Sequence, residues 1–207
     1  MTVADLRRLE KANPQIPQTI HRWTAANYDQ FVETLYTEID TIVKDLEDDA
    51  NLSQHYTENN YNSDICRQLK RLGYEAVHDK NQRGHADITV NFARYSWIGE
   101  GKKVQSVNNS HLIDGYGQLI DRYVTGKANA NHAGLLVYIL GKDAMHVMSS
   151  WRTHLTEKDL SDNGYAANIA PCSENPDHVF WSECTRHTSS GSTLKIRHIG
   201  LSLHWNP

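Results

Sequence analysis

The sequence predicts a mixed α/β domain, and three observations support that fold class. Apolar residues recur at helical spacing in residues 28–50 and again in residues 58–72. Between residues 74 and 104, short stretches alternate apolar and polar side chains, as half-buried strands do. The run "AGLLVYILG" (133–141) is apolar almost throughout, which is typical of a strand buried on both faces of a parallel or mixed sheet. Helices and strands in this order predict an α/β sandwich.

The composition is that of a globular chain. Of 207 residues, 22% are charged and 39% are hydrophobic, which excludes a disordered polypeptide. No run reaches the roughly 18 apolar residues that a membrane helix needs, so we expect no membrane association. The charged start "MTVADLRRLEK" has no apolar signal core, and a cytoplasmic location is therefore expected. Three cysteines are too few, and odd in number, for a disulfide framework.

The N-terminal quarter predicts two helices joined by a proline-containing connector. Residues 1–28 indicate a short polar helix followed by "NPQIPQT", and residues 28–50 indicate an amphipathic helix. This second helix contains eight acidic side chains and one lysine, a balance of −7 that leaves +3 for the rest of a chain of net charge −4. A solvated acidic face is expected there, with a partner-binding surface as the alternative. We assign residues 1–52 to an N-terminal helical extension and residues 53–207 to the main domain.

The next helix is expected over residues 58–72. Polar capping residues precede it, and Gly73 ends it. The stretch "RQLKR" (67–71) within it is basic, and for these side chains exposed solvated charge is the expected role and phosphate contact the alternative. The apolar stripe of this helix consists of Tyr61, Ile65, Leu69 and Leu72.

Strands dominate the remainder of the chain. Three are expected in succession, at "YEAVHDK" (74–80), "HADITVNF" (85–92) and "YSWIGEGKKV" (95–104). A helix over residues 111–126 separates them from the apolar strand at 133–141. A weaker helical pattern and then a hairpin, formed by "HVFWSECT" (178–185) and "TLKIRHIGLSLHW" (193–205), complete the chain.

The third of these strands places two opposite charges close together. Glu100 and Lys102 are separated by one residue, and side chains at i and i+2 of a strand point to the same face. Gly99 and Gly101 fall on the opposite face, where they do not crowd whatever packs there. Taken alone, the two charges predict an exposed ion pair worth less than ~1 kcal/mol.

Asp87 changes that interpretation. It lies in the preceding strand, and antiparallel pairing would bring its carboxylate close to that of Glu100. Two neighbouring carboxylates repel each other, so the arrangement makes sense with a divalent cation between them. Lys102 could then position an attacking water or steady a phosphate. In the following helix a polar stripe that can face this site consists of Asp114, Gln118 and Arg122.

Asp87 and then Glu100-Gly-Lys102 on consecutive strands, followed by a helix with Gln118, resemble the PD-(D/E)xK (restriction-endonuclease-like) nuclease superfamily. Ala86 stands where proline is expected before the aspartate. The resemblance extends over residues 58–140 and implies a core of helix, three strands, helix and strand, with Mg²⁺ (or Mn²⁺) as cofactor. The roles that it implies are catalysis for Asp87, Glu100 and Lys102, metal binding for Asp87, Glu100 and Glu58, and support for Gln118 and Arg122.

The function that this resemblance implies is metal-dependent hydrolysis of phosphodiester bonds in nucleic acid. DNA is the expected substrate. The expected context is a bacterial one or defence against phage. The alternative is a catalytically silent nuclease-like fold that serves as a nucleic-acid-binding or assembly subunit. A homodimer, or a partner protein, is expected to use the N-terminal helices.

Twelve histidines also raise the question of a zinc site. The sequence has one Cys-x-x-His pair, at Cys184 and His187, and Cys172 and His198 lie farther off. Because no second closely spaced pair accompanies it, the usual structural zinc pattern is missing. We therefore expect these histidines to be ordinary strand residues, with nucleic-acid contact as the alternative.

Overall fold

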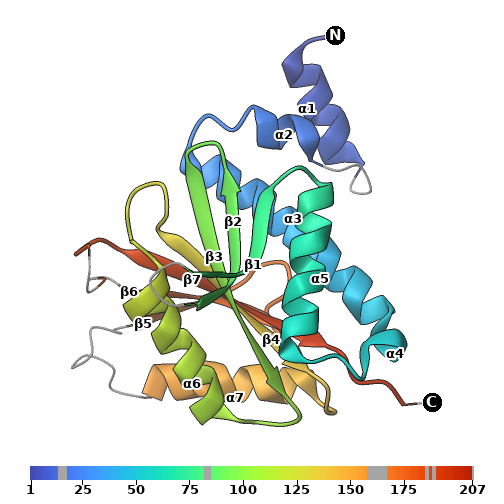
Figure 1. The fold of residues 1–207 in the computed structure, drawn as a ribbon, viewed down its shortest axis with the longest axis vertical. Helices are drawn as coiled ribbons and strands as arrows, with labels where there is room; N and C mark the ends of the chain where they lie inside the picture. The colour runs from blue at the N-terminus through green and yellow to red at the C-terminus, as the bar shows by residue number, and fades with distance from the viewer. Residues whose placement is uncertain (14–17, 82–84, 158–166, 185–186, 188–189, 207) are drawn as a thin grey trace.

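A computed structural model describes residues 1–13, 18–81, 85–157, 167–184, 187 and 190–206, with the backbone alone at residues 79–81, 85, 122, 123 and 167. Within these residues, seven strands form one mixed sheet in the order β1-β2-β3-β4-β7-β6-β5 (Figure 1). The predicted mixed α/β class is confirmed. The strands are β1 (Glu75–Asn81), β2 (His85–Phe92), β3 (Tyr95–Val104), β4 (His132–Ile139), β5 (Ala167–Pro171), β6 (Val179–Cys184) and β7 (Leu194–Ser202).

The middle of the sheet is parallel and its two sides are antiparallel. Strand β4 pairs in parallel with both β3 and β7. Strands β1, β2 and β3 form an antiparallel meander on one side, and β5, β6 and β7 form another. Every residue of β4 is buried, as its apolar sequence predicts. The predicted C-terminal hairpin is the β6–β7 pair, whereas β5 was not predicted.

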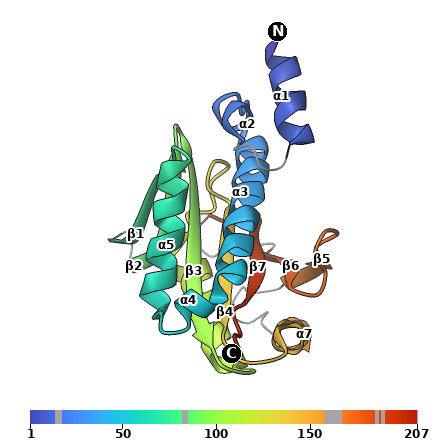
Figure 2. The same ribbon diagram turned by 90° about the vertical axis from the view of Figure 1, so that its right-hand side faces the viewer.

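Helices cover both faces of this sheet. Helices α3 and α5 pack against one face in a hydrophobic cluster with Trp97, Leu136 and Tyr138. Helices α6 and α7 pack against the other face in a second cluster with Leu135 and Val137. Figure 1 shows these four helices, and Figure 2 shows α3, α5 and α7 from a second side. The helices are α1 (Val3–Ala12), α2 (Thr19–Trp23), α3 (Tyr28–Asp48), α4 (Ala50–Ser53), α5 (Glu58–Arg71), α6 (Asn109–Gln118) and α7 (Ala144–Glu157), and a π-helical turn, η1 (Leu119–Tyr123), follows α6.

Local capping explains where α5 begins and ends. The Thr57 side chain accepts a hydrogen bond from the Asn60 backbone N–H, and the Asn60 side chain accepts one from Thr57 N–H in return. At the other end, Gly73 adopts a φ of 98°, which favours glycine. The helix predicted over residues 58–72 is therefore confirmed almost to the residue.

The helix predicted over residues 111–126 differs in its second half. The α-helix ends at Gln118, and the chain continues as a π-helical turn in which Val124 N–H donates to Leu119 O at 3.2 Å. Periodicity does not distinguish these two forms, because a single wider turn shifts the apolar pattern by one residue. The wider turn places both Leu119 and Ile120 in the core.

The N-terminal helices form an arm at one end of the molecule. Helix α1 lies apart from the sheet and connects through α2 to α3 (Figures 1 and 2). Helix α3, in contrast, shares the core with the sheet, since Phe31, Leu35 and Ile39 are fully buried. The division at residue 52 stays a prediction. Among the described residues, no helix is both long and apolar enough to cross a membrane.

Candidate active site

The antiparallel pairing of β2 with β3 brings Asp87 to Glu100. The register aligns Ile88 with Gly99, and Asp87 and Glu100 come next on their strands. The Asp87 carboxylate accepts a hydrogen bond from Gly101 N–H, with 2.9 Å between Oδ2 and N. Burial raises the pKa of Asp87, and this hydrogen bond opposes the effect. The predicted meeting of the two strands therefore occurs, and the Asp87 carboxylate is fixed against β3.

Glu100 is the most deeply buried acid of the group, at 2% exposure. Its Oε1 accepts a hydrogen bond from Lys102 Nζ at 2.6 Å, but its Oε2 is buried and has no hydrogen-bond partner. Burial, followed by the negative charge of Asp87, raises the pKa of Glu100 to about 7. A buried carboxylate oxygen without a partner costs free energy, so this atom is ready to accept a proton or a cation.

Lys102 is held in place from several sides. Its Nζ donates to Glu100 and also to Gln118 Oε1, at 3.3 Å. Its aliphatic chain passes over Gly115 of α6, where an added Cβ would lie 2.6 Å from Lys102 Cε. Burial works to lower the pKa of Lys102, but the charge of Glu100 and its hydrogen bond outweigh burial and leave the pKa raised. Lys102 therefore stays a cation, buried beside the two carboxylates. The ion pair is not the exposed one that its sequence alone would suggest.

Glu58 lies at the same site but faces the backbone of β3. It is the first residue of α5, and its Oε2 accepts a hydrogen bond from Lys103 N–H at 2.8 Å. The same atom lies 3.8 Å from His111 Nε2, in the first turn of α6. The first turns of two helices on opposite faces of the sheet thus meet beside β3. Since helix N-termini carry partial positive charge, an anionic ligand would be stabilised there.

The glycine between Glu100 and Lys102 allows α5 to approach the strand closely. A Cβ on Gly101 would lie 2.3 Å from Asn62 Oδ1 and 2.8 Å from Tyr138 Cε2. Tyr138 O–H donates to the same Asn62 oxygen at 2.6 Å. Asn62 and Tyr138 therefore hold α5 and β4 against the back of the site. Neither residue was predicted from the sequence, although Asn62 lies one turn after Glu58 on α5.

The described charged groups around Asp87 do not form a complete metal cage. Within the residues described, no three His, Cys, Asp or Glu side chains are grouped so as to hold a metal ion. Asp87 and Glu100 nevertheless offer carboxylate oxygens from adjacent strands, and Glu100 Oε2 has no other partner. Hard cations such as Mg²⁺ bind through one or two carboxylates and keep several waters. The residues present therefore fit a divalent cation with few protein ligands.

The other residues predicted for the site either lie at its margin or have side chains outside the described residues. Gln118 contacts Lys102, as stated above, whereas Asp114 is exposed. The side chain of Arg122 lies outside the described residues. The zinc candidate His198 is fully buried, where its Nδ1 accepts from Trp151 Nε1–H at 3.0 Å and its Nε2 contacts Ser182 Oγ at 2.8 Å. Burial lowers the pKa of His198 to about 3, so it serves as a neutral core residue.

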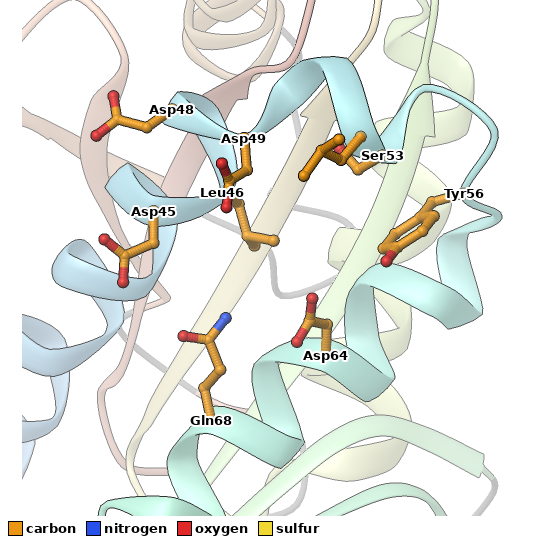
Figure 3. A pocket seen from close by; sticks show the side chains of 9 residues that line it. Asp45, Leu46, Asp48, Asp49, Ser53, Tyr56, Asp64 and Gln68 are labelled. Atoms are coloured by element: carbon orange, nitrogen blue, oxygen red, sulfur yellow. The ribbon is translucent and has the colours of Figure 1, made fainter.

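The acidic run of α3 lines a separate hollow of about 330 Å³ between α3, α4 and α5 (Figure 3). Leu46 and Tyr56 contribute apolar surface to it. Lys44 pairs with Asp48, and Arg67 pairs with Asp64, so part of the charge is already neutralised. The acidic side chains around the hollow are Asp45, Asp48, Asp49 and Asp64.

Comparisons of the chain with protein-family models, with curated proteins and with solved structures found no match.

Proposed function

We propose that the chain is a metal-dependent nuclease that hydrolyses phosphodiester bonds of nucleic acid, with DNA as the substrate. The observation that carries the proposal is the buried Glu100 carboxylate, with one unpartnered oxygen, between Asp87 and Lys102. A binding surface has no use for two repelling carboxylates buried beside a lysine, whereas phosphodiester hydrolysis has a use for each group.

The order of the elements supports the same proposal. Helix α5, strands β1 to β3, helix α6 and strand β4 follow one another, and β4 pairs in parallel with β3. This is the succession expected of a restriction-endonuclease-like core. The proposed assignment of the chain to that superfamily rests on this order together with Asp87, Glu100 and Lys102.

Each residue of the site has a proposed role. Asp87 and Glu100 would hold Mg²⁺ or Mn²⁺, and Glu58 would support the site through Lys103 N–H or a bridging water. The bound ion would supply an acidified water and charge neutralisation. Lys102 would hold a non-bridging phosphate oxygen as negative charge develops on it, and Gln118 would keep the lysine in position. Water adds to phosphorus, the bond to the leaving oxygen breaks, and that oxygen is protonated.

Cleavage of plasmid and single-stranded DNA, with Mg²⁺, Mn²⁺ or EDTA, tests the proposal. We expect cutting that requires the metal, and a loss of about a hundredfold or more in Asp87→Ala and in Lys102→Ala. Glu33→Ala is the matched control, because its carboxylate is exposed on α3, and it should cut like the wild type. Cutting that persists in the Asp87→Ala, Lys102→Ala double variant would contradict the proposal.

The alternative is a nuclease-like fold without catalysis that acts as a binding or assembly subunit. The acidic hollow beside α3 favours it, since a basic partner segment could bind there. Absence of cutting under every metal condition, combined with intact binding of nucleic acid or of a partner, would support this alternative.

A further inference from the structure

A basic groove runs between α5 and the edge strand β1. It has a volume of about 360 Å³ and is lined by Ser63, Cys66, Arg67, Lys70, Arg71 and His78. Arg67, Lys70 and Arg71 lie at i, i+3 and i+4, so they share one face of the helix. The basic side chains of "RQLKR" (67–71), for which the sequence allowed either solvated charge or phosphate contact, therefore line a concave surface.

The charge of this groove is positive. Arg67, Lys70 and Arg71 are exposed cations, and Asp64, at 2.6 Å from Arg67 Nη2, is the acid that pairs with them among the described residues. The groove also contains His78, whose Nε2 is buried and has no hydrogen-bond partner. Among the described side chains, three cations against one acid leave an excess that favours an anionic ligand.

The groove adjoins the candidate active site. His78 pairs with Ile88 in the β1–β2 register, and Ile88 directly follows Asp87. The two sites also interact through their charges, because His78 acts to lower the pKa of Asp87. The groove therefore lies beside the strand that carries Asp87, on the side of the sheet that α5 covers.

We propose that this groove binds the sugar-phosphate backbone of a nucleic-acid strand and leads one of its phosphodiesters to Asp87 and Glu100. The inference rests on the proposed nuclease function for the identity of the ligand. Lys70 and Arg71 are the phosphate contacts, Arg67 exchanges Asp64 for a phosphate, and His78 offers a further donor. Such contacts position a strand without reading its sequence, so binding through the groove is independent of base sequence.

Binding of a fluorescently labelled 30-nucleotide single strand to the full chain in EDTA tests the groove separately from cleavage. We expect Lys70→Gln, Arg71→Gln to weaken binding about tenfold or more, and to reduce the slope of log affinity against log salt by about 1.4, since each lost phosphate contact contributes about 0.7. The control is Arg8→Gln, Lys11→Gln, which removes the same charge from exposed positions on α1 and should bind like the wild type. Thermal unfolding of both variants verifies that they are folded.

The outcomes separate this inference from the proposed function. The groove proposal would be overturned if the Lys70→Gln, Arg71→Gln variant bound the strand with wild-type affinity. It would also be overturned if both double variants lost affinity equally, or if the wild type did not bind. If the wild type cuts DNA in those cases, the proposed function still stands. If the wild type never cuts, but binding depends on Lys70 and Arg71 and not on Arg8 and Lys11, the groove stands and the nuclease proposal fails.

Discussion

The side chain of Glu100 is buried, and only one of its two carboxylate oxygens has a hydrogen-bond partner. A carboxylate in water would be ionised at neutral pH, whereas burial and the nearby Asp87 raise the pKa of Glu100 to about 7. Lys102 stabilises the charged form of Glu100 by donating a hydrogen bond to Oε1, whereas Glu100 Oε2 has no hydrogen bond. A residue of this kind destabilises the metal-free chain, and strain of this kind is common where a binding site is prepared for its ligand.

The raised pKa of Glu100 predicts how the metal-free protein responds to pH. The ordinary pKa is 4.5 and the folded value is about 7, so the folded chain binds more protons than the unfolded chain between these values. The contribution of Glu100 to stability is therefore fully present below pH 4.5 and is lost as pH rises through about 7. In EDTA, Glu100→Gln should become more stable relative to the wild type as pH rises from 5 to 8.

Thermal unfolding of both proteins at several pH values measures this difference. Glu33→Gln, on the exposed face of α3, is the control, and its melting temperature should follow that of the wild type. Parallel curves for the wild type and Glu100→Gln would show that Glu100 ionises normally in the folded chain.

At the scale of the elements, two glycines set the distances between β3 and its covering helices. Gly101 brings the strand against Asn62 of α5, and Gly115 of α6 makes room for the chain of Lys102. The obstacles differ in kind. Behind Gly101 lie a buried amide and the ring of Tyr138, whereas beside Gly115 lie the aliphatic chain of Lys102 and, at 3.2 Å from an added Cβ, Leu135 Cδ1.

These two glycines predict different effects of one added methyl group, on stability at Gly101 and on cleavage at Gly115. Gly101→Ala should destabilise the fold by ~1–3 kcal/mol, because Asn62 and Tyr138 are packed and hydrogen-bonded. Gly115→Ala should cost less stability than Gly101→Ala, because the preference of alanine for the helix, up to ~1 kcal/mol, offsets part of the crowding against Lys102 and Leu135. It should still reduce cleavage tenfold or more by displacing Lys102, since a misplacement of about 1 Å can cost about a hundredfold.

Chemical denaturation and cleavage rates, measured on both variants, distinguish these effects. Full activity in Gly115→Ala would mean that Lys102 readjusts without consequence, and full stability in Gly101→Ala would mean that α5 can move away from β3.

At the scale of the whole molecule, the sheet separates two hydrophobic clusters, and the site lies beside β3 where α5 and α6 begin. Glu58 comes from the helix on one face and His111 from the helix on the other, yet their side chains approach within 3.8 Å. The N-terminal arm lies at one end of the molecule (Figure 1). In α1, Glu10 is the buried residue, and its carboxylate accepts hydrogen bonds from Ile20 and His21 N–H at the start of α2.

Removal of residues 1–13 should therefore leave the fold largely intact. We expect a loss of about 1 kcal/mol, the usual cost of losing an N-terminal cap on a helix. Unfolding should stay cooperative, because α3 to α7 and the sheet keep their contacts. Urea denaturation followed by circular dichroism measures both quantities. A loss of several kcal/mol would show that α1 contributes to the core after all.

Much of the fold was predictable because its signals are local. The alternation in residues 85–92 and 95–104 gave the correct bounds of β2 and β3, and the apolar run at 133–141 predicted a central strand. Helix α2 and strand β5, five residues each, were missed because so few residues carry no clear periodicity. The π-helical turn was missed because it depends on how Leu119 and Ile120 pack.

The sequence by itself determined which charged groups come together. Asp87, Glu100 and Lys102 follow from residue types, their spacing and the two-residue period of a strand. Only the tertiary structure decided what surrounds them: the burial that raises the pKa of Glu100, the hydrogen bond from Lys103 that engages Glu58, and the packing of Asn62 behind Gly101. The reason is physical. Local pattern fixes the face on which a side chain lies, whereas dielectric environment and contacts arise from segments distant in the chain.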